Sequence, residues 1–313
     1  MTEKIATREA YGKALVKLGE KNKNIVVLDA DLSSSTKTAN FAKAFPERFF
    51  NVGIAEQNLI GTAAGLAAAG KIPFVSSFAM FATGRAFEQI RNTVAYPRLN
   101  VKIAATHAGI TVGEDGASHQ TVEDISIIRS IPQMTVIVPS DGVETEAAII
   151  AAAEIEGPVY IRMGRMAVPT VNQENYRFQL GKAVVFREGT DVLLVGTGIM
   201  VEACLRAAEI LQQEGISAGV INIHTIKPID KDTIIEMARK TGAVVTAEEH
   251  SVIGGLGSAV AEVLSESYPV PMQRVGIADS FGESGKPQDL LNKYGLNAQN
   301  IVSAAKNVIS RRK

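Results

Sequence analysis

The residues best suited to chemistry lie between positions 51 and 120. Glu56 is a carboxylate set in an apolar run, and His107 and His119 flank an acidic loop punctuated by glycine. Imidazole can donate, accept and exchange protons near neutral pH, so the two histidines suit a polar, hydroxylated substrate. A lone histidine is more often a packed residue than a catalyst, but the close spacing of these two favours a site. A metal on His107, Asp115 and His119 is a less favoured alternative, because the loop has neither an HExxH motif nor the acidic order of a calcium loop.

Glu56 opens a predicted helix with the sequence EQNLIGTAAGLAAAG, whose small residues allow close packing. One interpretation is an ordinary first-turn glutamate that interacts favourably with the helix dipole. The other is a carboxyl held against apolar neighbours, where it can share a proton with the ring nitrogen of a ligand. Position alone leaves both interpretations open.

The elements that must position these residues alternate along the chain. Apolar residues at helical spacing over 7–20 precede a short β-branched run at 25–31. Further strands are predicted at 49–53, 72–78, 101–107, 134–140 and 158–164, each followed by a segment long enough for a helix. In a doubly wound parallel sheet, ligands gather at the carboxyl ends of the strands. The residues at or just past such ends are Asp31, Glu56, Phe78, His107 and Arg162.

A second α/β unit follows a break in the pattern. Polar and proline residues punctuate the stretch from about 165 to 188, and beyond it strands alternate with helices predicted at 199–213, 231–240 and 254–266. The expected fold class is therefore α/β, with two doubly wound, mostly parallel-sheet domains. The predicted division is a first domain at 1–170, a linker at 171–188 and a second domain at 189–313.

Composition excludes several classes of function. With 313 residues and a formal net charge of -1, the chain has no basic stripe of the kind that nucleic-acid binding needs. Cys204 is the single cysteine, which excludes disulfides within the chain and a cysteine-rich metal site. No apolar leader or membrane-spanning run is recognisable, so we expect a cytoplasmic protein without membrane contact.

Seven motifs, taken in order, resemble the C-terminal part of transketolases, which are thiamine-diphosphate enzymes. They are IATREA, ADLSSST, GIAEQN, FAMF, THAGITVGEDGASHQ, YIRMGR and DSFGESGKPQDLLNKYG. The resemblance covers nearly the whole chain, as a pyrimidine-binding domain followed by a transketolase C-terminal domain. GIAEQN is shared with related thiamine enzymes. The long histidine-containing motif points to transketolase, because deoxyxylulose-phosphate synthases lack both the histidine matched by His107 and the GED triplet.

The resemblance implies a cofactor site at the pyrimidine end of thiamine diphosphate. Glu56 would hydrogen-bond N1′ of the aminopyrimidine and start the catalytic cycle by sharing a proton with it. Phe81, with Phe78 nearby, would stack on the ring, and Asp31 would lie near the cofactor and the subunit contact. Gly84 replaces an aromatic residue that commonly forms one wall of this pocket.

The resemblance also implies a sugar-phosphate site. His107 and Asp115 would hydrogen-bond the hydroxyls of a ketose, and His119 would join them in proton transfer. The residues that look like the phosphate clamp are Arg8, Ser35 and Arg162. A guanidinium suits this role because it binds phosphate oxygens bidentately.

One part of a complete transketolase is missing from this sequence. The motif that binds diphosphate and Mg²⁺, GDG with a later asparagine, does not occur, since GEDG at 113–116 belongs to the substrate loop. The resemblance thus implies the C-terminal subunit of a split transketolase, active only with an N-terminal subunit that carries the diphosphate and Mg²⁺ ligands, in a self-associated α2β2-type assembly. The alternatives are a 1-deoxyxylulose-5-phosphate synthase-like chain, a β-type subunit of an oxo-acid dehydrogenase, or a non-catalytic scaffold subunit.

Overall fold

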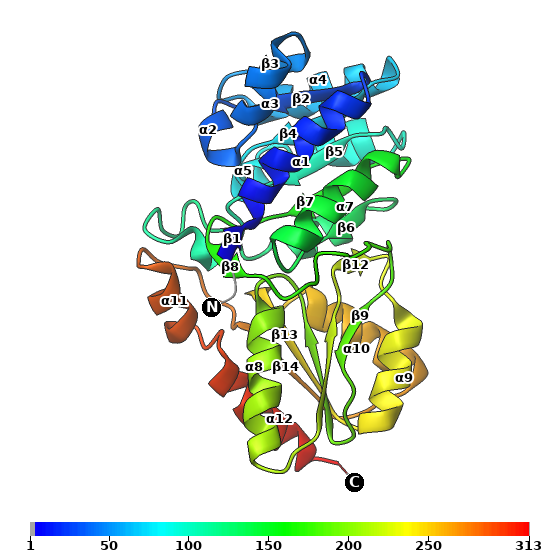
Figure 1. Cartoon of the computed structure of the whole chain (residues 1–313), viewed down its shortest axis with the longest axis vertical. Coiled ribbons are helices and arrows are strands. Elements are labelled where there is room, and N and C mark those ends of the chain that lie inside the picture. Colours follow the sequence, from blue (N-terminus) through cyan, green and yellow to red (C-terminus); the bar gives the residue numbers. More distant parts are fainter. Residues whose placement is uncertain (1–3, 313) are drawn as a thin grey trace.

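The computed structural model describes residues 4–312 and arranges them as two α/β halves, one above the other (Figure 1). The first half is built on a seven-stranded sheet in the order β12-β6-β7-β5-β4-β2-β3, parallel except for β12. Its strands are β2 (Ile25–Asp29), β3 (Phe49–Asn51), β4 (Ile72–Ser76), β5 (Lys102–Ala105), β6 (Thr135–Ile137), β7 (Val159–Arg162) and β12 (Thr225–Lys227). All six strands predicted for this half are present, although each ends two or three residues before its predicted end.

Helices cover both faces of this sheet, as a doubly wound fold requires. Its helical segments are α1 (Thr7–Lys21), α2 (Ser33–Thr36), α3 (Ala39–Ala44), η1 (Pro46–Arg48), α4 (Glu56–Ala68), α5 (Ala79–Gly84), the π-helical η2 (Gln89–Ala95), η3 (Ile110–Val112), α6 (Asp124–Arg129) and α7 (Gly142–Glu154). Because side chains alternate along a strand, Ile25 and Val27 pack in the core under α1 and α7, whereas Val26 and Leu28 pack in the core under α4 and η2. The buried faces therefore fix α4 and its first residue, Glu56, at one edge of the sheet.

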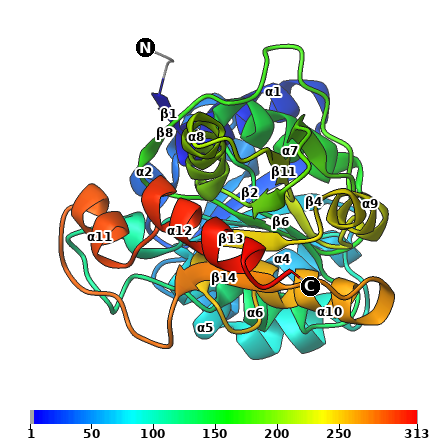
Figure 2. The same cartoon turned by 90° about the horizontal axis from the view of Figure 1, so that it is seen from below.

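The second half is a five-stranded sheet in the order β14-β13-β10-β11-β9, parallel except for β9. Its elements are β9 (Val184–Arg187), β10 (Val192–Gly196), α8 (Met200–Gln213), β11 (Ala218–Asn222), α9 (Lys231–Thr241), β13 (Val244–Ser251), α10 (Leu256–Ser267), β14 (Met272–Ile277), α11 (Pro287–Lys293) and α12 (Ala298–Ile309). Helices α8 and α12 pack on one face and α9 and α10 on the other (Figure 2). The predicted fold class, two mostly parallel α/β domains, is confirmed.

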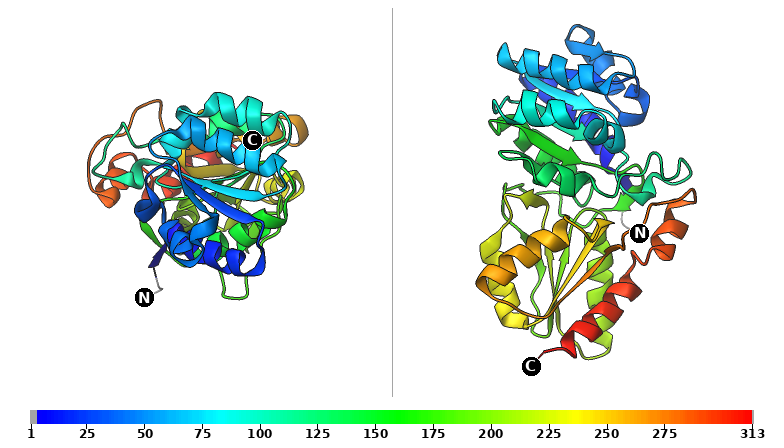
Figure 3. Two further views of the ribbon diagram at one scale, coloured as in Figure 1. Left: turned by 90° about the horizontal axis from the view of Figure 1, so that it is seen from above. Right: turned by 180° about the vertical axis from the view of Figure 1, so that it is seen from behind.

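The two halves are joined by more than one connection. Strand β9 lies within the predicted linker yet forms the edge of the second sheet. Conversely, β12 comes from the second half of the sequence and pairs with β6 of the first sheet, and Val138 N donates to His224 O at 2.7 Å beside it. A short antiparallel ribbon of β1 (Lys4–Ala6) and β8 (Ala167–Pro169) lies at the junction (Figures 1 and 3). Within residues 4–312, no helix combines the length and apolarity that a membrane crossing demands.

Candidate active site

Glu56 lies at the start of α4 with its carboxylate almost fully enclosed. The side chain is 4% exposed, and its Oε1 accepts a hydrogen bond from Ser77 Oγ at 3.4 Å. Arg85 Nη1 lies 3.2 Å from each of the two carboxylate oxygens and donates to them. Glu56 and Arg85 border an open pocket of about 480 Å³, whose other lining residues are Ile54, Ala55, Gln57 and Asn58. The carboxylate is thus buried on the protein side and faces a pocket on the other.

An aromatic cluster lies just beyond the end of β4. Phe78 forms a parallel bridge with Thr106, and its ring stacks on the His107 ring with centroids 3.8 Å apart. The Phe81 ring lies 6.0 Å from that of Phe78, and the His119 ring meets Phe81 edge-on at 5.2 Å. The structure therefore brings together four of the residues that the sequence predicted for one site. The parallel register of β4 and β5 is what aligns these strand ends.

His107 is a neutral acceptor in this arrangement. Its Nε2 lies 3.2 Å from Arg8 Nη1, and because a guanidinium has donors only, Nε2 must accept. The proton is then on Nδ1, which donates to Thr106 Oγ1 at 2.8 Å. Burial, followed by the charges of Arg8 and Arg165, lowers the pKa of His107 to about 3. At neutral pH the ring is uncharged, and both of its nitrogens have partners within the protein.

Replacing His107 by asparagine is expected to make the protein less sensitive to acid. The folded state leaves His107 neutral down to a pKa of about 3, whereas the unfolded chain takes up the proton at an ordinary histidine pKa, so stability falls as pH falls between the two. The loss of unfolding free energy from about pH 8 to about pH 5 should be about 2 kcal/mol smaller in the variant. Asparagine tolerates the positive φ of 56° at this position. Urea unfolding of both proteins at the two pH values measures the difference; equal losses would contradict it.

The loop after β2 carries Ser35 and Asp31 to the same edge of the sheet. The buried carboxylate of Asp29 shapes this loop by accepting hydrogen bonds from three of its donors, namely Leu32 N, Thr36 Oγ1 and Thr38 Oγ1. Ser35 presents its carbonyl oxygen to Arg8 Nη1 at 2.9 Å. Asp31 is exposed, has a positive φ of 64° and accepts from Asn51 Nδ2 at 3.1 Å. Arg8, Ser35 and His107 are therefore neighbours, while Asp31 contacts Asn51.

Arg162 differs from its predicted role. The side chain is 6% exposed, its Nε donates to Asp124 Oδ2 at 2.8 Å, and its Nη2 donates to Glu249 O at 2.9 Å. A guanidinium enclosed by these internal acceptors cannot reach a phosphate in the pocket, which contradicts the clamp predicted for it. The reason is its place in β7, where the side chain points into the protein toward α6.

Arg165, three residues further on, lies at the edge of the site instead. Its side chain is 37% exposed, and Nη1 donates to Val112 O at 2.6 Å and lies 3.6 Å from Asp115 Oδ2. Its charge is close enough to act on both Arg8 and His107. Sequence reasoning missed this residue, although the YIRMGR motif contains both arginines. The available signal was that Arg165 follows the buried strand rather than belonging to it.

Residues of the second half of the chain pack against the loop that carries His107, Asp115 and His119. Glu249 Oε1 accepts from Thr111 N at 2.7 Å, and a Cβ added to Gly109 would lie 2.3 Å from the same carboxylate. Helix α11 packs against η3 within this loop, as Figure 1 shows beside the junction. The loop conformation thus depends on both halves.

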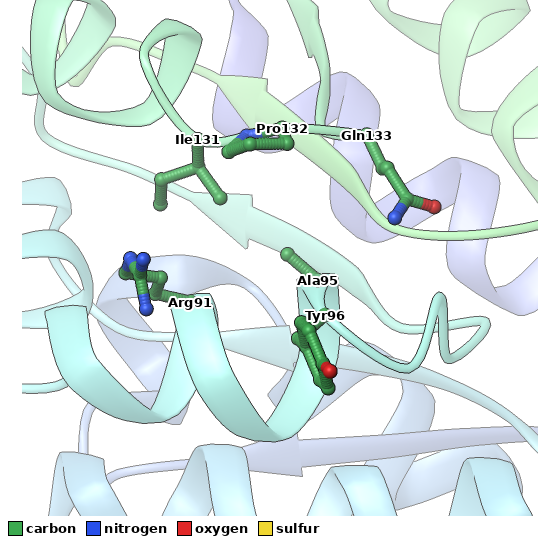
Figure 4. A pocket seen from close by; sticks show the side chains of 6 residues that line it. All are labelled: Arg91, Ala95, Tyr96, Ile131, Pro132 and Gln133. Carbon is green, nitrogen blue, oxygen red and sulfur yellow. The ribbon is translucent and has the colours of Figure 1, made fainter.

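A second pocket is chemically poorer. It has a volume of about 70 Å³ and lies between η2 and the segment 131–133, lined by Arg91, Ala95, Tyr96, Ile131, Pro132 and Gln133 (Figure 4). No carboxylate or histidine is among these residues. Over residues 4–312, no group of three or more His, Cys, Asp or Glu side chains is arranged to hold a metal ion. This pocket therefore offers less chemistry than the one at Glu56.

Comparison with known proteins covers almost the whole chain. The transketolase pyrimidine-binding domain matches residues 3–170, and the transketolase C-terminal domain matches residues 181–301. A predicted transketolase C-terminal section of Methanocaldococcus jannaschii is 56% identical over 94% of this chain and 93% of its own length. The 6-deoxy-6-sulfo-D-fructose transketolase subunit SqwH of a Clostridium species is 48% identical over 97% of this chain and 95% of its own length.

A solved structure agrees with these matches. It is described as a split gene transketolase in an inactive β4 tetramer, and it has a TM-score of 0.93 to this chain. The two sequences are 61% identical, and the match covers 99% of this chain and 100% of the other. The resemblance inferred from the motifs is confirmed in both domains and in their order. The chain therefore belongs to the transketolase family, of which it carries the pyrimidine-binding domain and the C-terminal domain.

Proposed function

We propose that this chain is the C-terminal subunit of a split transketolase, which transfers a two-carbon ketol unit from a ketose phosphate to an aldose phosphate. The observation that carries the proposal is an enclosed carboxylate, Glu56, and an aromatic face, Phe81, that lie within reach of one side chain beside an open pocket. Both groups already engage one planar donor, the Arg85 guanidinium. An aminopyrimidine ring offers the same combination of a flat face and nitrogen donors, so the residues fit the pyrimidine end of thiamine diphosphate.

Glu56 would hold a proton between its carboxyl and the pyrimidine ring, and Phe81 would orient the ring by stacking, with Phe78 behind it. When bound, thiamine diphosphate supplies the nucleophilic carbon and the electron sink that cleavage next to a carbonyl requires. Asp31 would lie near the cofactor from the β2 loop. Gly84 would leave this side of the pocket without an aromatic wall.

The substrate would be bound by the groups around His107. We assign hydrogen bonds to the ketose hydroxyls to His107 and Asp115, and proton transfer to His119. A neutral His107 fits a hydrogen-bonding role because its Nε2 would accept from a hydroxyl in place of Arg8 Nη1, without taking up the proton. The residues assigned to the phosphate are Arg8, Ser35 and Arg165. The last replaces Arg162, whose donors are used inside the protein.

A separate N-terminal subunit would carry the groups that hold the diphosphate and Mg²⁺. The names of two relatives, a subunit and a split-gene product, support this division. We propose an α2β2 assembly in the cytoplasm in which this chain also contacts its own copies. The similar solved structure is described as an inactive β4 tetramer, that is, a protein that associates with its own copies and has no activity.

The purified chain, given thiamine diphosphate, Mg²⁺ and a ketose and an aldose phosphate, is expected to form no transfer product. Adding the N-terminal subunit should start ketose formation, because the diphosphate ligands are then present. Chromatographic or enzyme-coupled measurement of the product ketose checks this, with the N-terminal subunit alone as the control. Turnover by this chain alone would contradict the split. Release of CO₂ from an oxo acid would instead favour the synthase or dehydrogenase alternatives.

A further inference from the structure

We propose that Arg85 is an internal plug of the pyrimidine pocket, which occupies the place of the aminopyrimidine ring and must move out when the cofactor binds. This inference rests on the proposed function, because it takes Glu56 and Phe81 as the pyrimidine site. It concerns a residue to which the sequence motifs assign no role.

Three contacts place Arg85 in the pocket. Its Nη1 lies 3.2 Å from both Glu56 oxygens, so one donor engages the whole carboxylate. Its guanidinium carbon lies 4.1 Å from the centroid of the Phe81 ring, over the ring face. Arg85 also lines the same open pocket as Glu56. A ring that stacks on Phe81 and hydrogen-bonds Glu56 would need the positions that this guanidinium now fills.

The plug has a physical reason to close. A carboxylate that is only 4% exposed is costly without a partner, and the remaining side-chain donor, Ser77 Oγ, is at a long 3.4 Å. A guanidinium suits this place because it is planar, stacks on aromatic faces and carries donors at its edge. Arg85 therefore satisfies Glu56 and covers Phe81 in the same way as a pyrimidine would.

The plug also has room to open. The Arg85 side chain is 51% exposed, in contrast to Glu56, so its guanidinium can move into solvent without crossing the core. It follows directly after α5, as the C-cap residue, and the preceding Gly84 has no side chain that would restrict it. The exchange of one planar donor for another can thus occur at the pocket mouth.

This competition weakens the apparent affinity for the cofactor. A ligand that binds only the open pocket has its dissociation constant raised by the inverse of the open fraction. For one partly exposed ion pair and one cation-π contact, removal of the plug should lower Kd about three- to tenfold. Replacing Arg85, a residue that contacts the site, is thus expected to increase the affinity for the cofactor.

The test is calorimetric titration of thiamine diphosphate, with Mg²⁺ present, into the complex reconstituted from both subunits. Arg85→Met keeps the length of the side chain and removes the charge and the donors, so Kd should fall about three- to tenfold. Arg91→Met is the matched control, because Arg91 is an exposed arginine of η2 whose guanidinium contacts Asn92 and not Glu56. The Kd of this variant should equal that of the unaltered protein. In a Glu56→Gln background, Arg85→Met should give a smaller gain, because the ion pair that anchors the plug is gone.

Two results would overturn the proposal. If Arg85→Met weakens cofactor binding, Arg85 is a ligand of the cofactor; if Kd is unchanged, the contact does not compete. Should Arg85→Met fail to fold, Arg85→Lys keeps the charge without the planar fork and should still lower Kd, by a smaller factor. A structure of the loaded complex must also show the guanidinium away from Glu56. Failure of the proposed function is distinguishable, because the unaltered complex would then neither bind the cofactor nor transfer a ketol unit.

Discussion

Replacing Glu56 by glutamine is expected to lower ketol transfer by the reconstituted complex about a hundred- to ten-thousand-fold, the range found when a group that transfers protons is removed. An amide has nearly the same size as the carboxylate but cannot share a proton with a ring nitrogen. The loss should therefore appear in kcat, and KM for the sugar phosphates should change little. Steady-state kinetics at saturating cofactor measure both constants.

The control for this variant is assembly. Glu56 forms an ion pair with the half-exposed Arg85. Loss of this ion pair leaves the apolar packing of α4 intact. The variant should elute with the N-terminal subunit as a complex of unaltered size. A variant that assembles and keeps its kcat within a few-fold of the original would favour the scaffold alternative, in which this fold serves without catalysing.

The two arginines of the YIRMGR motif should give opposite phenotypes. Arg162→Met breaks a buried ion pair and leaves the Asp124 carboxylate without its charged partner, which typically costs about 3–5 kcal/mol of stability. Arg165→Met removes one hydrogen bond at a partly exposed position, at about 1 kcal/mol, but takes a cation from the proposed phosphate site. We therefore expect Arg162→Met to lower the urea midpoint sharply and Arg165→Met to raise KM about tenfold or more for phosphorylated substrates.

Each arginine variant is the control for the other. Urea unfolding and KM are measured on both, and a non-phosphorylated sugar is compared with its phosphate. The increase in KM for Arg165→Met should vanish for the non-phosphorylated sugar. If the Arg162→Met protein folds normally and selectively loses phosphate binding, the phosphate-binding role predicted for Arg162 from the motif would be supported.

Most of the fold could be predicted because its elements are long and periodic. The central strands are apolar runs, and the three helices predicted for the second half begin within two residues of the predicted positions. The short strands β9 and β12 escaped prediction. Each is an edge strand of only a few residues, and its pairing partner lies far away in the sequence, so no local pattern reveals it.

The site was predictable where chain order and sheet geometry agree. Phe78 and His107 follow neighbouring parallel strands, so their rings had to meet. Arg162 was misjudged because its partner, Asp124, lies on a helix that the motif does not include. Arg85 could not be predicted, since an arginine after a short helix is ordinarily a solvated residue. Its contacts arise because the start of α4 lies beside the end of α5.

The crossing of β12 from the second half to the first sheet limits where this chain could be divided. A break between the two halves would leave β6 as an unpaired edge and remove the hydrogen bonds that Lys227 Nζ donates to the carbonyls of Arg129 and Ile131. Exposed strand edges template pairing with other chains, so each fragment would be prone to aggregation. If the two halves were produced as separate chains, the boundary between them would therefore have to lie beyond Lys227. Otherwise the two fragments would have to fold together.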